Sequence, residues 1–152
     1  MALLLTLLVT PLQVMSGQPA LVRLRRMLGL TTFFYAALHM MAWAGWDHAF
    51  GLMSMWHDTL DRPFVAFGML AFVILTILAL TSNHWSMKWL KTKWKSLHQL
   101  IYLGTLAIVL HYWLHKAGKN DFTEVTIYGS VALVLLAWRL VRKLRSVRRV
   151  QA

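Results

Sequence analysis

The sequence predicts an all-α protein, a polytopic transmembrane helical bundle with about five spans, and three observations support this prediction. Hydrophobic residues make up 59% of the 152 positions and the mean hydropathy is +0.56, whereas a soluble domain is about 45–50% apolar. The Lys and Arg residues fall in short blocks between long uncharged segments. These segments have about the 20 residues that a helix needs to cross a bilayer, and so few segments cannot close a β-barrel.

The first apolar segment covers residues 1–22, which contain no charged side chain. We expect one span that reaches Val22, in which neighbouring helices satisfy the carbonyl group that Pro11 leaves without its helical hydrogen bond. A secretory signal peptide is the alternative, but a positively charged start and a small-residue cleavage site are missing.

Residues 27–46, 63–82 and 97–115 form the next three apolar segments, and none of them contains Asp, Glu, Lys or Arg. At a rise of 1.5 Å per residue, about 20 residues cross the hydrocarbon core, so each segment is expected to be one transmembrane helix. The fifth segment, at about 125–141, contains a single charged residue, Arg139.

The basic residues predict the orientation of the bundle. Thirteen of the 16 Lys and Arg residues lie in 23–26, in 83–96 and from Arg139 onward, and the alternate connections hold the other three. The alternate connections also contain all five acids, namely Asp47, Asp58, Asp61, Asp121 and Glu124. Because positively charged loops stay inside, we expect 23–26, 83–96 and a basic tail at about 142–152 in the cytoplasm, and the N-terminus outside. The chain 1–152 is expected to form a single transmembrane domain.

Charge and composition exclude several other functions. The formal net charge of +11 could indicate nucleic-acid binding, but blocks that alternate with apolar segments form no basic face on a soluble domain, so no nucleic-acid partner is expected. The absence of cysteine excludes disulfides, cysteine-ligated iron–sulfur clusters and covalent haem attachment, so any haem would be a non-covalent haem b. No G-x-G-x-x-G run indicates a nicotinamide or flavin domain, so quinol or a separate protein would supply the reductant.

Three histidines inside the apolar segments, His39, His98 and His111, are the candidate functional residues. Ionisable side chains at membrane depth are costly and mark functional sites, and imidazole is the usual axial ligand of a membrane-buried haem iron. His39 lies about 18 Å and His111 about 20 Å from the cytoplasmic side, so they are predicted to meet at one depth on two helices. His98 is expected at the inner end, where it would bind a second haem or act as an alternative ligand. On one ideal helix it would point about 140° away from His111.

The other candidate residues have plainer interpretations. A lone membrane histidine can simply form a hydrogen bond to a neighbouring helix. His115 shares a helix face with His111 and could belong to another kind of metal site, although a position at the membrane surface is favoured. The methionines are expected to fill packing gaps, and Arg25 and Arg26 mainly set topology but could also pair with haem propionates or phosphate groups. Three further histidines fall in connections and are expected to be solvated: His48, His57 and His84.

The succession of several short runs resembles the MsrQ family, formerly YedZ, within the ferric-reductase-like transmembrane group. The runs are R-R-M-L-G-L at 25–30, A-L-H ending at 39, R-P-F-V-A-F-G at 62–68, A-L-T-S at 79–82, W-K-S-L-H-Q-L-I-Y-L at 94–103 and L-H-Y-W at 110–113. They cover nearly the whole chain in the same order and with similar spacing. The family usually has six spans, and the resemblance implies that the first of these has no counterpart in this chain.

This resemblance implies a haem-binding electron-transfer subunit in the inner membrane of a bacterium. The subunit would pass electrons from quinol to a periplasmic molybdopterin partner, MsrP, which reduces oxidised methionine in envelope proteins. The haem-ligand positions of the family correspond to His39, His98 and His111. FMN is also implied by the resemblance, but no residue here forms a recognisable flavin motif.

Two other functional classes remain open from the residues alone. A small histidine-dependent transporter or a metal-binding membrane assembly factor would also use intramembrane histidines, although no internal repeat and no intramembrane carboxylate supports a transporter. A stand-alone ferric or superoxide-generating reductase would need a cytosolic reductase domain. A haem spectrum would separate the electron-transfer function from the transporter.

Overall fold

All regular elements in the described part of the chain are helices, which confirms the predicted all-α class. A computed structural model describes residues 2–118 and 120–151. In chain order the elements are α1 (Ala2–Ser16), α2 (Leu21–Ala42), the π-helical turn η1 (Trp43–Asp47), α3 (Leu52–Asp61), α4 (Pro63–Leu80), α5 (His84–Leu90), α6 (Thr92–Leu97), α7 (Leu100–Ala117) and α8 (Thr123–Gln151).

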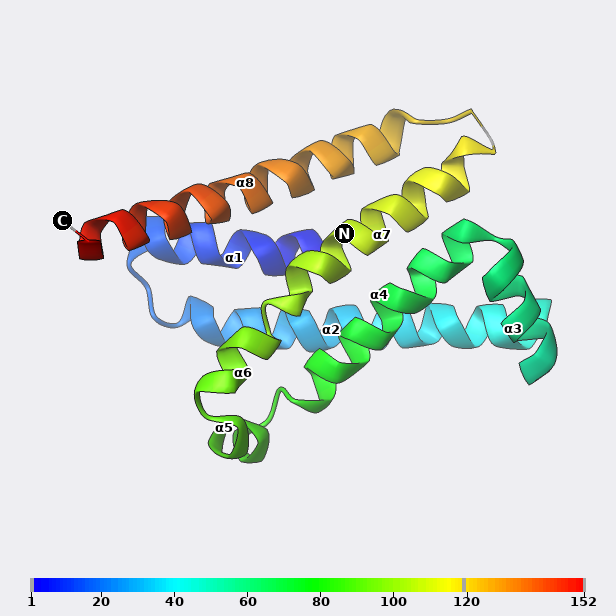
Figure 1. Cartoon of the computed structure of the whole chain (residues 1–152), viewed down its shortest axis with the longest axis horizontal. Helices are drawn as coiled ribbons and strands as arrows, with labels where there is room; N and C mark the ends of the chain where they lie inside the picture. The colour runs from blue at the N-terminus through cyan, green and yellow to red at the C-terminus, as the bar shows by residue number, and fades with distance from the viewer. Residues whose placement is uncertain (1, 119, 152) are drawn as a thin grey trace.

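The long helices form one elongated bundle. Figure 1 shows α2 along its length, with α1 and α8 on one side and α4 and α7 crossing obliquely. The most extensive contact joins α4 to α7, followed by the contact of α1 with α2. Helix α3 and the α7–α8 connection lie at one end, which we call the acidic end because the five acids fall there. The opposite end, with 23–26, 83–96 and the last part of α8, is called the basic end.

The helices confirm a multi-pass membrane protein. Within residues 2–118 and 120–151, four segments are long and apolar enough to cross a membrane: Arg23–Asp47, Pro63–Leu80, Thr92–Ala117 and Thr123–Arg145. The apolar helix α1 is shorter, about 22 Å at 1.5 Å per residue. Large apolar side chains such as Leu80, Leu133 and Val134 stay more than half exposed, as expected on a surface that faces lipid.

The first span does not reach Val22, so that boundary was wrong. Helix α1 ends at Ser16, and Gly17 follows with φ +67°, a left-handed conformation that glycine adopts without steric cost. The chain turns there and α2 begins at Leu21. The basic stretch 23–26, expected in a connection, therefore forms the first turns of α2.

A neighbouring helix does satisfy the backbone at Pro11, as expected from the sequence. Proline has no N–H group, so the carbonyl oxygen of Leu7, four residues earlier, lacks its helical donor. Nη2 of Arg139 on α8 donates to this oxygen over 2.8 Å and to Oγ1 of Thr10 over 2.9 Å. This contact ties α1 to α8 at the proline.

The fourth apolar segment is not one uninterrupted helix. Helix α6 ends at Leu97, α7 begins at Leu100, and a turn at His98 and Gln99 separates them. The predicted angle of about 140° between His98 and His111 assumed a single ideal helix and does not apply. Helix α8 likewise differs from expectation, because it continues to Gln151 through most of the predicted basic tail.

Small residues bring α4 and α7 close together. A methyl group added at Gly104 would lie 3.1 Å from Cγ2 of Ile74, and Ala71 and Ala107 are both 2% exposed. Small side chains at such contacts allow the backbones of membrane helices to approach. This close approach places the outer half of α7 directly against the start of α4.

Candidate functional site

A cavity of about 1210 Å³, partly open to the outside, lies between the helices toward the acidic end. Its walls come from α1, α2, η1, α4, α7 and α8, and most of the lining side chains are apolar or aromatic. Three of the seven histidines, His39, His111 and His115, line it. The sequence placed two of these three at matching depth, and the structure brings all three to one space.

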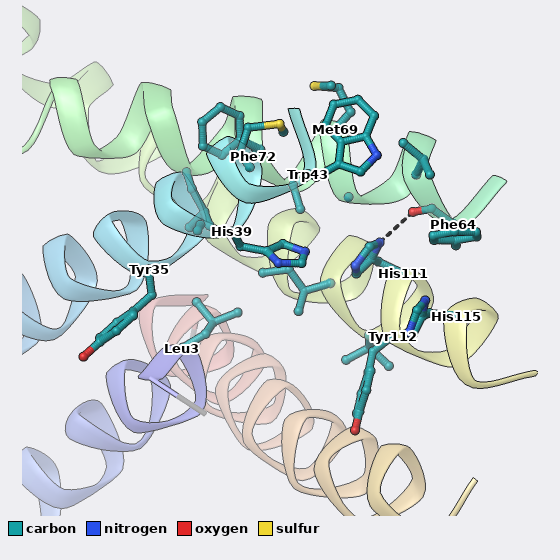
Figure 2. A pocket seen from close by; sticks show the side chains of 18 of the residues that line it. Leu3, Tyr35, His39, Trp43, Phe64, Met69, Phe72, His111, Tyr112 and His115 are labelled. Carbon is teal, nitrogen blue, oxygen red and sulfur yellow. Dashed lines mark hydrogen bonds between the residues drawn. The ribbon is translucent and has the colours of Figure 1, made fainter. Parts of the chain in front are cut away.

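His39 on α2 and His111 on α7 face each other in this cavity (Figure 2). The centroids of the two imidazole rings are 6.3 Å apart and the ring planes are inclined by 73°. Two imidazoles that bind one metal from opposite sides, each at about 2.0–2.1 Å, have ring centroids roughly 6 Å apart. The pair therefore has the spacing of two axial ligands.

A backbone carbonyl determines which nitrogen of His111 carries the proton. Nδ1 of His111 lies 2.7 Å from the carbonyl oxygen of Phe64. A carbonyl oxygen can only accept, so Nδ1–H is the donor and Nε2 is the unprotonated nitrogen. Metal-binding histidines commonly donate their second ring N–H to a carbonyl or carboxylate in this way, because the contact fixes both tautomer and ring orientation.

Gly68 makes room for the His111 ring. An added Cβ at Gly68 would lie 2.8 Å from Nδ1 and 3.0 Å from Cε1 of His111, which is closer than unbonded atoms approach. Pro63 starts α4 at its first position, where its missing N–H costs nothing. The start of α4 thus supplies a carbonyl acceptor at Phe64 and a flat backbone surface one turn later.

His115 lies one turn beyond His111 on α7. Its ring is 6.5 Å from the His111 ring at 16°, and 5.4 Å from the Phe64 ring. It is exposed, whereas His111 is half-buried. His115 therefore stands at the outer rim of the histidine pair.

His98 lies apart from the other two predicted site residues. Its ring stacks on Trp94 at 3.9 Å and 27°. Nδ1 is 3.2 Å from the carbonyl oxygen of Trp94, and Nε2 is 3.3 Å from Oγ of Ser82. Both ring nitrogens thus have protein partners, and His98 is absent from the lining of the cavity.

A polar network beside the cavity, which Trp43 and Arg62 also line, was missed by the sequence reasoning. His48 was expected to be solvated, but its side chain is 6% exposed, so that expectation was wrong. Its Nδ1 contacts Oγ of Ser54 at 2.6 Å and its Nε2 contacts Oδ2 of Asp58 at 3.2 Å. Asp58 also accepts from Nε1 of Trp43 at 3.2 Å and pairs with Arg62. The only sequence signal was the i, i+4 spacing of Asp58 and Arg62 before Pro63.

The Asp58 carboxylate organises this network. Burial raises the pKa of Asp58, but hydrogen bonds from Arg62, Trp43 and His48 outweigh that effect and hold the pKa below its usual value. Asp58 is therefore ionised at neutral pH. It fastens α3 to η1, whose wide π-helical turn is a type of irregularity frequent at functional sites.

The described residues contain no group of three or more His, Cys, Asp or Glu side chains arranged to hold a metal ion. A metal bound by protein alone generally needs three or four such ligands. A haem iron needs only axial ligands from the protein. The facing pair suits the second arrangement.

Fold and site together define a multi-pass helical membrane protein with two facing imidazoles in a cavity between its helices. Residues 1–109 match the family described as ferric reductase like transmembrane component. Relatives named protein-methionine-sulfoxide reductase heme-binding subunit MsrQ are similar over most of this chain. The relative from Bordetella pertussis is 50% identical over 91% of this chain and 67% of its own length. The relative from Ralstonia nicotianae is 46% identical over 89% of this chain and 63% of its own length. The relative from Xanthomonas campestris is 41% identical over 99% of this chain and 67% of its own length.

The chain belongs to the MsrQ family of ferric-reductase-like transmembrane proteins, which confirms the resemblance seen in its sequence. It spans about two thirds of the length of these relatives. No solved structure matches it.

Proposed function

We propose that this chain is a haem-binding electron-transfer subunit of the membrane, with His39 and His111 as axial ligands of one haem b. The observation that carries the proposal is the opposed ring pair at 6.3 Å, in which His111 donates Nδ1–H to Phe64. The names of the relatives, which are heme-binding subunits, support the same cofactor.

The surroundings of the pair fit a haem. The cavity is large and mostly apolar, as sites for organic cofactors are, and a buried macrocycle there would be shielded from water by α2, α4 and α7. The haem would supply one-electron chemistry. The protein would set its properties through the two imidazoles, the hydrogen bond to Phe64 and the low polarity of the walls.

His98 remains a predicted ligand at the inner end. We propose that it binds a second haem or acts as an alternative ligand, and in either case one of its ring nitrogens must exchange its present protein partner. Its contacts with Trp94 and Ser82 therefore predict a weaker effect of its removal than for His39 or His111.

The charges at the two ends of the bundle support a proposed direction of electron transfer. We propose that quinol in the bacterial inner membrane supplies the electrons, that the basic end with the C-terminus is cytoplasmic, and that a periplasmic molybdoenzyme, MsrP, collects electrons at the acidic end. Methionine sulfoxide would be reduced on that partner. The cavity with His39, His111 and His115 lies toward the acidic end, which supports delivery to an outer partner. FMN is proposed from the resemblance alone.

A reconstituted electron-transfer assay tests this function. Purified protein is mixed anaerobically with a quinol, and the haem absorption is followed before and after addition of the molybdoenzyme and methionine sulfoxide. We expect quinol to reduce the haem, and the partner to reoxidise it only when the sulfoxide is present. Haem that quinol does not reduce, or that the complete partner mixture does not reoxidise, would contradict the proposed route.

A further inference from the structure

Arg139 lies in the apolar part of α8, and its guanidinium group has fewer hydrogen-bond acceptors than donors. Nη2 is engaged by Leu7 and Thr10, and Nη1 lies 3.4 Å from the hydroxyl of Tyr102. Its Nε is buried and has no hydrogen-bond partner, the sole case among the buried side-chain atoms of the described residues. A buried donor left unpaired is costly, so such a group points to a ligand or a water.

A second arginine shares this location. Arg25 on α2 interacts electrostatically with Arg139 and with Tyr102, and also with His98. The guanidinium of Arg139 lies 5.5 Å from the centroid of the Tyr102 ring. Two like charges in one place repel, and charges at membrane depth require a compensating group.

No carboxylate of the residues that the structure describes can provide that compensation. All five acids belong to the acidic end, whereas Arg25 and Arg139 belong to the basic end (Figure 1). Three of the acids already pair with cations of their own: Asp58 with Arg62, and Asp121 and Glu124 with Lys116. An anion from outside the chain is therefore needed.

We propose that Arg25, Arg139 and Tyr102 form a binding site for the phosphate group of an anionic phospholipid. Basic pockets between transmembrane helices on the cytoplasmic side are typical sites for anionic lipid head groups. The free Nε–H of Arg139 can donate a charge-assisted hydrogen bond to a phosphate oxygen. Tyr102 can accept from Arg139 and donate its hydroxyl proton to the same anion. These residues and the groups that Arg139 contacts belong to α1, α2, α7 and α8, so a bound lipid would fasten the N-terminal helix to the rest of the bundle.

Lipid retention by the purified full chain tests this site. The delipidated protein in detergent is titrated with phosphatidylglycerol, phosphatidylcholine or inorganic phosphate, and bound lipid is measured by native mass spectrometry. Arg25→Gln and Arg139→Lys are compared with Arg142→Gln, an exposed arginine three residues further along α8. We expect phosphatidylglycerol affinity to fall at least about fivefold in the first two variants and to be unchanged in the third.

The choice of variants separates binding from folding. Arg139→Lys keeps a donor for the Leu7 carbonyl, and Arg25→Gln leaves the bond from Arg139 to Leu7 in place, so helix content by circular dichroism should match the parent in both. An equal loss in Arg142→Gln, or no loss in the first two variants, would overturn the site. Competition by millimolar inorganic phosphate, or equal affinity for phosphatidylcholine, would overturn the anionic lipid as the occupant. Loss of haem with unchanged lipid affinity would instead assign the arginines to a haem propionate.

Discussion

At the scale of single residues, the protonation of His111 depends on a contact that spans 47 positions of the chain. The Phe64 carbonyl accepts a hydrogen bond from Nδ1–H of His111 and leaves Nε2 as the ligand nitrogen. The facing histidine could be inferred from depth along two helices. The hydrogen-bond acceptor of His111 could not be inferred from the sequence, because every residue has a carbonyl group. Only the packing of α4 against α7 selects the carbonyl group of Phe64.

Gly68→Ala tests the space reserved for His111. The added methyl would meet Nδ1 at 2.8 Å, so the ring must move away from Phe64. We expect a shifted or lost haem absorption and a free energy of unfolding lowered by about 1–3 kcal/mol, the usual cost of overpacking. Absorption spectra and chemical denaturation of the purified variant provide both readings.

Two other glycines give matched controls for Gly68→Ala. Gly104→Ala crowds Ile74 at the same α4–α7 contact without touching a histidine, and Gly118→Ala meets nothing within 4 Å. Gly104→Ala should lower stability yet keep the spectrum, and Gly118→Ala should change neither. A spectrum altered equally by Gly104→Ala would show that general loosening, not the position of His111, is responsible.

At the scale of elements, Arg139 compensates for the break that Pro11 causes in α1. Pro11→Ala restores a backbone donor for the Leu7 carbonyl, so the bond from Arg139 becomes less important. Arg139→Gln should therefore destabilise the parent more than it destabilises the Pro11→Ala background. A double-mutant cycle by thermal or chemical unfolding should give a coupling of about 0.5–3 kcal/mol. Additive effects would show that the two residues act independently.

The attachment of α3 should depend on pH through Asp58. The folded-state pKa of Asp58 is below its unfolded value, so the stabilisation is complete above the unfolded pKa of about 3.9 and is lost as the pH falls through the folded value. The protection of the amides of residues 43–62 against hydrogen exchange, relative to their intrinsic exchange rate at each pH, should fall on acidification. Asp58→Asn should show fast exchange already at neutral pH.

Asp61→Asn is the control for this effect, because Asp61 is an exposed carboxylate one turn after Asp58 on α3. It should preserve slow exchange at neutral pH. If Asp58→Asn and Asp61→Asn behave alike, the network around Asp58 does not hold α3.

Helices that are marked by a long apolar segment of the sequence were predicted well. Features that depend on a backbone turn or on contacts between side chains were not predicted. Uninterrupted apolar length located the helices that became α2, α4, α7 and α8. The end of α1 at Ser16 depends on a left-handed Gly17, which an apolar count does not detect. The turn at His98 likewise involves its contact with Trp94, and the burial of His48 involves its contact with Asp58. Neither contact belongs to a periodic pattern of the sequence.

At the scale of the whole molecule, the distribution of charge predicts which end of the bundle faces the cytoplasm. The chain has no cysteine, so a single introduced thiol can be labelled without background. In spheroplasts, a membrane-impermeant maleimide should label His57→Cys on α3 and should label Lys88→Cys on α5 only after permeabilisation. Both positions are exposed. The reverse labelling pattern would invert the proposed direction of electron transfer.

Haem binding by the opposed pair is tested most directly by pyridine-haemochrome and reduced-minus-oxidised absorption spectra of the purified chain. We expect a haem b spectrum in the parent, loss of that haem in His39→Ala and in His111→Ala, and partial loss or an altered spectrum in His98→Ala. His57→Ala, an exposed histidine of α3, should retain the full spectrum. A parent without haem, or unchanged spectra in both His39→Ala and His111→Ala, would contradict the assignment.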